Sequence, residues 1–207
     1  ERMQVYFNPT PSNNQINNMA AQLKSSIDKN ITKNKLSHLS FYYDSVIKQI
    51  YGQAVQDKSW VGSDTWDFFQ TKIGNYNVIK SGYKNILILL TDGYMLYIPT
   101  KNCVGTKCNW LSSKKINELK LNTPKWEEDY TRNNFGFIPV NGNFNNLRIL
   151  VLGINPEPGN VFEKQVLHKY WEDWFSIMGV KKTMFKILDS DLPSNLDETI
   201  QNFILQD

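Results

Sequence analysis

The sequence predicts an α/β protein with a Rossmann-like, mostly parallel central sheet and helices on both faces. Two apolar runs, NILILLTDG from Asn85 and RILVLGINP from Arg148, have the length and the Ile and Leu content of buried parallel strands. Segments with helical periodicity alternate with these and other candidate strands, which is typical of a parallel sheet covered by helices. A length of 207 residues suits a single domain, which we assign to 1–207.

The N-terminal third is expected to contain a short strand, a helix and further strand. Residues 3–7, MQVYF, predict a strand that ends at Asn8-Pro9-Thr10-Pro11-Ser12, because two prolines in three residues exclude a sheet or helix interior. A helix follows, since apolar residues recur at helical spacing from Ile16 to Ile27. The stretch 36–50 is rich in aromatic and β-branched residues with loose alternation, and it predicts one or two strands.

The middle of the chain is expected to hold the central strand and an insertion. Residues 60–69 indicate a loop that runs into a helix, with Ser63 or Asp64 as the N-cap. The run 85–91 predicts a central parallel strand. We interpret 94–140 as a long insertion, with a helix around 111–120 and a loop-like stretch that carries Trp126 and Arg132.

The C-terminal third returns to regular alternation. A strand begins at Arg148, and the apolar stripe of 162–178 predicts the best helix of the chain, which Gly179 ends. Residues 183–188 predict a strand. A last helix is expected to open with a capping box from Ser194 to Asp197.

Composition and cysteine usage restrict the class of partner. The net charge of +3 arises from 23 basic and 20 acidic residues spread along the chain, which does not indicate nucleic-acid binding, and the pair Lys114-Lys115 is interpreted as solvated. No apolar run approaches the ~20 residues of a membrane span. Cys103 and Cys108 are compatible with a disulfide in an oxidising compartment or with two free thiols.

Three loops at expected strand or helix ends carry oxygen ligands. They are the segments 8–12, 62–65 and 91–93, which offer hydroxyls, an amide oxygen and carboxylates. Ligands of open α/β sheets bind beyond the carboxyl ends of the strands. Such oxygen donors suit a hard cation such as Mg²⁺ or Ca²⁺.

The order of elements and these loops resemble the von Willebrand factor A-type (VWA) domain and its metal-ion-dependent adhesion site. In that family an Asp-x-Ser-x-Ser loop, a Thr and an Asp, often within Thr-Asp-Gly, hold a divalent cation whose open position takes an acidic residue of a partner. The counterparts in this chain are Asn8, Thr10 and Ser12, then Thr65, then Asp92. Asn8 replaces the leading acid and removes one negative charge, so the resemblance implies a degenerate site. The resemblance leaves two alternatives open. The degenerate site binds Mg²⁺, Mn²⁺ or Ca²⁺, or it binds its partner without a metal ion.

These observations lead to a function and two alternatives. The resemblance implies a non-enzymatic protein-interaction or adhesion-type module, without catalytic residues, whose partner is another protein. The alternative is a hydrolase or transferase that uses Asp92, with Asp64, as acid, base or metal ligand. A third reading is a structural domain of a larger envelope-associated protein. The Cys pair and the start at Glu1 rather than Met favour an extracytoplasmic location: secreted, periplasmic or lipid-anchored.

Neither histidine is expected to be catalytic. His168 falls on the polar side of the helix 162–178, and its predicted partner is Glu172, at i+4. His38 lies in a strand candidate and is interpreted as structural. The segment 155–159, NPEPG, follows a strand and is interpreted as a turn at the rim of the sheet.

Overall fold

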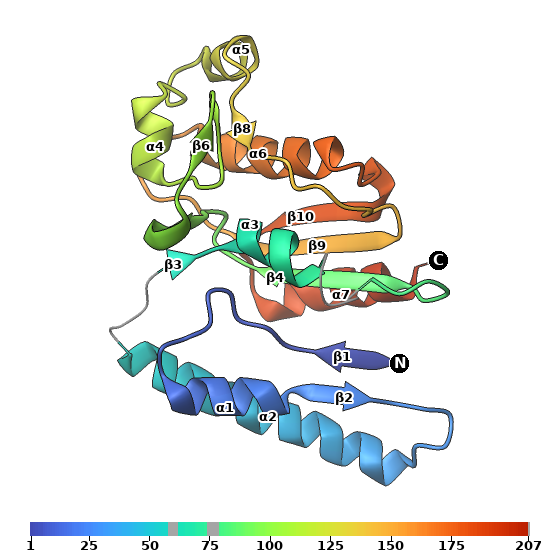
Figure 1. Ribbon diagram of the computed structural model, residues 1–207. Helices are drawn as coiled ribbons and strands as arrows, with labels where there is room; N and C mark the ends of the chain where they lie inside the picture. The colour runs from blue at the N-terminus through green and yellow to red at the C-terminus, as the bar shows by residue number, and fades with distance from the viewer. Residues whose placement is uncertain (58–61, 74–78, 207) are drawn as a thin grey trace. The chain divides into compact units, whose positions relative to one another are not determined.

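The computed structural model describes residues 1–57, 62–73 and 79–206 (Figure 1). The chain divides into two compact units, Glu1–Gly62 and Ser63–Asp207, and each is described by itself. The strand β3 (Gly62–Ser63) stands at the boundary between them. Trp60 and Val61, the first residues of the predicted loop at 60–69, lie outside the described residues.

The first unit packs two helices beside a short pair of strands. The strands β1 (Arg2–Gln4) and β2 (Lys24–Ser26) are antiparallel. The predicted helix after the proline loop is confirmed as α1 (Asn14–Gln22), although it ends before Ile27. Its N-cap is Asn13, whose side-chain oxygen accepts hydrogen bonds from the amides of Gln15 and Ile16.

The prediction of strands over 36–50 is wrong, because this stretch belongs to α2 (Lys33–Gln56), a helix of 24 residues. Tyr43, Val46 and Ile50 fall at i, i+3 and i+7 and are buried on one face. Together with Ile16 and Leu23 of the α1 region they form the core of this unit. Aromatic and β-branched residues favour strands only weakly, and burial of one helical face outweighs that preference.

The second unit contains a parallel three-stranded sheet in the order β10-β9-β4. Its strands are β4 (Asn85–Leu90), β9 (Leu147–Ile154) and β10 (Phe185–Asp189), which confirms the three strands predicted in these regions. The central strand is β9, buried along nearly its whole length. The prediction that 85–91 is central is wrong, since β4 lies at an edge of this sheet and Leu90 is 72% exposed.

Helices cover both faces of this sheet (Figure 1). The predicted helix at 162–178 is confirmed as α6 (Glu163–Ile177), which buries Trp171, Trp174 and Phe175 in the main core together with Ile149 and Val151 of β9. On the other face, Phe203 of α7 (Pro193–Leu205) packs with Leu150 and Leu152. The predicted capping box is wrong: the N-cap of α7 is Leu192, two residues before Ser194, and its side chain makes no capping hydrogen bond, so the helix begins at Pro193.

Residues 94–140 form short helices and strands whose apolar side chains pack into the main core of the second unit. These are β5 (Leu96–Tyr97), the 3₁₀ turn η2 (Ile98–Thr100), β6 (Cys103–Val104), β7 (Lys107–Cys108), α4 (Ser113–Glu118), α5 (Trp126–Arg132) and β8 (Gly136–Phe137). The helix predicted around 111–120 is confirmed as α4, whereas the loop predicted at Trp126 and Arg132 is wrong, since both lie in α5. Met95, Leu111 and Phe137 are each at most 1% exposed, so this region is part of the core.

Two further local predictions are resolved in the second unit. Asp64 is the N-cap of the helical turn α3 (Thr65–Asp67), as expected, and the turn continues as the π-helix η1 (Phe68–Ile73). Cys103 and Cys108 form a disulfide that closes the β6–β7 hairpin. The short 3₁₀ segment η3 (Lys182–Met184) leads into β10.

Candidate functional site

The carboxyl ends of β4, β9 and β10 form one edge of the parallel sheet, here called the rim. The amide of Asn155 donates to the carbonyl of Asp92 over 2.9 Å, and the amide of Ser190 donates to the carbonyl of Ile154 over 2.9 Å. Each loop after a strand is therefore tied to its neighbour by backbone bonds. This edge is the place where parallel α/β sheets bind ligands.

Asp92 lies at the rim as a turn residue with an exposed side chain. Its Oδ1 accepts a hydrogen bond of 3.0 Å from the Tyr94 amide, and the Thr91 hydroxyl oxygen accepts one of 3.1 Å from the Gly93 amide. Within the part of the chain that the structure describes, Oδ2 of Asp92 accepts no hydrogen bond. The segment is thus both a turn and a carrier of an available carboxylate oxygen.

Gly93 allows the rim to lie directly against the main core. It has a φ of +103°, and a Cβ at this position would stand 3.0 Å from Ile154 Cδ1 and 3.2 Å from Leu167 Cδ1. The indole nitrogen of Trp171 donates a buried hydrogen bond of 2.9 Å to the Gly93 carbonyl. The turn that carries Asp92 is therefore held by α6.

Tyr94 joins two rim loops to the start of α6. Its hydroxyl donates to Oε1 of Glu163 over 2.6 Å and accepts from the Glu157 amide over 2.8 Å. Glu163 is 1% exposed and lies in the first turn of α6, where a carboxylate also suits the helix dipole. Burial, followed by the hydrogen bond to Glu163, raises the pKa of Tyr94 well above its usual value, so this phenol stays a donor at neutral pH.

His168 pairs with Asp189 at the end of β10, and the predicted pair of His168 with Glu172 is wrong. His168 Nε2 lies 2.7 Å from Asp189 Oδ1, and Lys164 Nζ donates to Asp189 Oδ2 over 3.1 Å. Glu172 instead pairs with Lys182 at 3.0 Å. Partial burial alone would raise the pKa of Asp189, but the bonds from His168 and Lys164 outweigh it and hold that pKa below its usual value.

The residues expected to hold a cation are distributed over both units. Asn8, Thr10 and Ser12 lie in the first unit, in the loop between β1 and α1. Thr65 and Asp92 lie in the second unit, and no hydrogen bond of its described residues joins Thr65 to Asp92. Among the described residues no three His, Cys, Asp or Glu side chains come together as a metal-binding group.

Asp64, the expected second acid, is engaged elsewhere. It is 3% exposed, its Oδ1 accepts from the Asp67 amide over 2.9 Å, and its Oδ2 accepts from the Thr100 hydroxyl. The chemistry of the remaining donors still fits a hard cation in part, since the Asp92 carboxylate and the Thr65 hydroxyl are oxygen ligands. Asp92 is the carboxylate on which a cation at the rim would depend.

Sequence reasoning missed Tyr94, Glu163 and Asp189 as rim residues. Tyr94 directly follows the Thr-Asp-Gly segment, and Glu163 opens the most regular helix of the chain. A carboxylate at the start of a helix that follows a parallel strand points to this edge of the sheet. That signal identifies Glu163 as a rim candidate, but no local pattern pairs it with a tyrosine 69 positions earlier.

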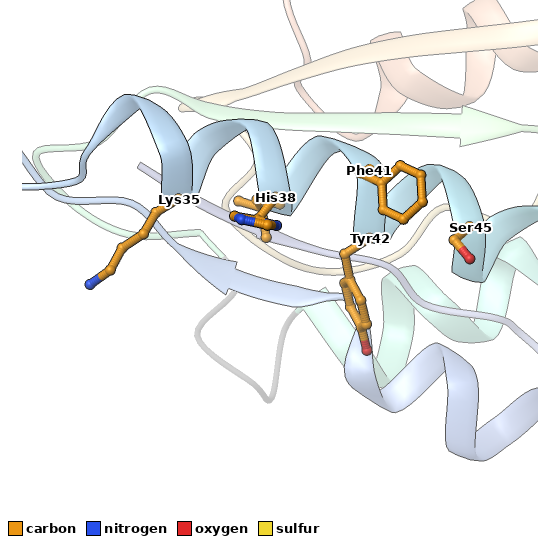
Figure 2. A pocket seen from close by; sticks show the side chains of 6 residues that line it. Lys35, His38, Phe41, Tyr42 and Ser45 are labelled. Carbon is orange, nitrogen blue, oxygen red and sulfur yellow. The ribbon is translucent and has the colours of Figure 1, made fainter.

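A separate hollow of about 520 Å³ lies on α2 in the first unit (Figure 2). It is lined by Lys35, His38, Leu39, Phe41, Tyr42 and Ser45. Phe41 is 74% exposed, so the hollow is an open helix surface. His38, expected within a strand, is an exposed residue of this helix.

Comparison with known protein families, with curated proteins and with solved structures finds no match. In the described part of the chain, no helix combines the length and the apolar character needed to cross a bilayer.

Proposed function

We propose that this chain is a non-enzymatic, VWA-like protein-binding module that engages its partner at the rim. The observation that carries the proposal is the exposed Asp92 carboxylate at the carboxyl end of β4, with one oxygen that accepts no bond from the described residues. A carboxylate in this position can meet a cationic side chain directly or hold a divalent cation that an acidic partner residue completes.

The order of the rim loops suits a binding surface. Hydrogen bonds of Tyr94, Trp171 and Asn155 hold the loops around Asp92, and such prior order lowers the entropic cost of association. The hydrolase or transferase alternative has less support, because its second acid, Asp64, is buried and uses both oxygens as hydrogen-bond acceptors. The disulfide supports an oxidising, extracytoplasmic location for the module.

The cation-dependent form of the proposal is tested by thermal unfolding with Mg²⁺, Mn²⁺ or EDTA. A cation that binds only the native state, present at about 100 times its Kd, adds about 2.7 kcal/mol to the free energy of unfolding. This raises Tm by roughly 5–10 °C in a protein of this size. We expect this rise for the wild type and its loss in Asp92→Ala. The control is Asp197→Ala, an exposed carboxylate on α7, which should keep the rise.

Equal Tm values with cation and with EDTA in wild type and both variants would rule out the cation-dependent form. The metal-free form is then tested by NMR titration with a lysine-containing peptide, with chemical shifts followed at the Asp92 and Tyr94 amides. Unchanged shifts at both amides would contradict binding at the rim.

A further inference from the structure

One stretch of the second unit carries a local positive charge that the near-neutral total conceals. Between 101 and 125 the chain has six lysines and a single acidic residue, Glu118. The lysines are Lys101, Lys107, Lys114, Lys115, Lys120 and Lys125. All but Lys107 and Lys115 are exposed. A concentrated positive charge of this kind raises the local concentration of anionic partners and steers their approach.

Two of these lysines share one aromatic ring. Lys101 Nζ lies 3.5 Å from the ring centroid of Trp110, and Lys115 Nζ lies 5.1 Å from the same centroid. Both distances are within the ~6 Å range of a cation–π contact. The two ammonium groups are therefore closer together than one Debye length, about 10 Å at 0.1 M salt, and repel each other.

Among the described residues, no carboxylate forms an ion pair with either ammonium group. An anion placed between them would relieve their repulsion and add charge-assisted hydrogen bonds. The cationic pair is thus complementary in charge to an acidic group from outside the chain.

Rigid neighbours hold the backbone at both lysines in place. The buried side chain of Asn109 donates to the Thr100 carbonyl over 2.8 Å and accepts from the Asn102 amide over 2.7 Å, which fixes the backbone on both sides of Lys101. The Cys103–Cys108 disulfide closes the hairpin between them. The Ser112 hydroxyl caps α4 by accepting from the Lys115 amide over 3.2 Å. Prior order of this kind is what a docking surface needs.

We propose that Lys101, Trp110, Lys114 and Lys115, here called the basic surface, dock an acidic peptide segment of a protein partner. Carboxylates of that segment bind the lysines, and its apolar residues contact Ile98 and Val104, each 65% exposed. A nucleic acid fits less well, because its phosphates would use the lysines and leave the exposed apolar side chains of Ile98 and Val104 uncovered. No rim residue takes part, so this surface goes beyond the function proposed for the rim.

The test is fluorescence anisotropy with a fluorescein-labelled oligoglutamate peptide and the full chain at low salt. We expect saturable binding that weakens as NaCl is added. Lys101→Glu with Lys115→Glu should weaken binding at least about tenfold, since two attractive contacts become repulsive. The control, Lys181→Glu with Lys186→Glu, makes the same change in net charge at two exposed lysines outside the basic surface and should lower affinity less than about threefold.

Several outcomes would overturn the proposal. One is an equal loss of affinity in both charge-reversed variants, and another is no binding by the wild type at low salt. A third is tighter binding of oligothymidine or of phosphatidylserine vesicles than of oligoglutamate. Circular dichroism melts identify a misfolded variant, and Lys101→Gln with Lys115→Gln then replaces the charge reversal, with a loss of about threefold or more expected. Asp92→Ala should bind the peptide as the wild type does, which separates this surface from the rim.

Discussion

The hydroxyl of Tyr94 lies 2.6 Å from the buried carboxylate of Glu163, and this bond joins the loop after β4 to the first turn of α6. The same hydroxyl accepts from the Glu157 amide in the loop after β9. A single phenol therefore connects three segments of the rim. Its loss leaves a buried acceptor and a backbone donor without their partner.

Tyr94→Phe should accordingly destabilise the second unit. A buried acceptor left without its donor costs about 1–3 kcal/mol. Urea unfolding followed by circular dichroism measures this free energy. Tyr83→Phe, at a tyrosine that is 53% exposed, is the matched control and should change stability by less than about 0.5 kcal/mol. Equal stability of the two variants would mean that the Tyr94–Glu163 bond contributes nothing.

Gly93→Ala should be more destabilising than Gly82→Ala. Both glycines have positive φ, +103° and +78°, so alanine is strained at either site. Only at Gly93 would the new Cβ meet Ile154 and Leu167, whereas nothing lies within 4 Å at Gly82. We expect an additional loss of about 1–3 kcal/mol from overpacking at Gly93, measured by urea denaturation. A smaller loss at Gly93 than at Gly82 would contradict the close contact between the turn and α6.

Asp64→Ala should weaken the link between α3 and the segment that carries Thr100. The substitution removes an N-cap, worth about 1 kcal/mol, and a buried acceptor of the Thr100 hydroxyl. We expect a total loss of about 2–3 kcal/mol in chemical denaturation. Asp64→Asn keeps a side-chain oxygen for the cap and should recover about half of the loss. An asparagine variant as unstable as the alanine variant would show that the carboxylate charge, and not the cap, matters.

Asp189 should make the stability of the second unit fall at acid pH. Its pKa is lowered in the folded state, so its contribution is present above the unfolded value of about 3.9 and is lost as pH falls through the folded pKa. Wild type and Asp189→Asn should therefore differ in free energy of unfolding at neutral pH and converge as the pH falls below the folded pKa of Asp189. Urea titrations from neutral to acid pH measure the difference. A constant gap across that range would contradict the pairing with His168 and Lys164.

The three strands of the parallel sheet and α6 were predictable because their signals are local and consistent. Helix α6 combines a broad apolar stripe with a glycine of positive φ at its end, Gly179. The stretch 36–50 was misinterpreted because its composition favours strands while the spacing of Tyr43, Val46 and Ile50 favours a helix. There, the packing of one face determines the outcome. Trp126 and Arg132 were assigned to a loop because α5 is too short to show a clear period.

The candidate site was predictable only at the end of the strand 85–91. Thr-Asp-Gly after an apolar run placed Asp92 at the carboxyl end of a strand, and the structure agrees. The partners of the rim residues were beyond sequence reasoning, because the bond from Tyr94 to Glu163 spans 69 positions and that from His168 to Asp189 spans 21. The sequence predicts Glu172 as the partner of His168 because helical spacing identifies neighbours on the same helix and not a partner on another element.

The sequence by itself determined the three strands of the parallel sheet, where α6 ends, and that an acid and a glycine follow β4. Periodicity and turn chemistry suffice for these features, since each depends on neighbours within a few residues. Only the tertiary structure decided that β9, and not β4, is the central strand, that Asp64 is buried, and that Lys101 and Lys115 meet on Trp110. Strand order, burial and contacts between distant side chains depend on how the elements pack, and no local pattern encodes that packing.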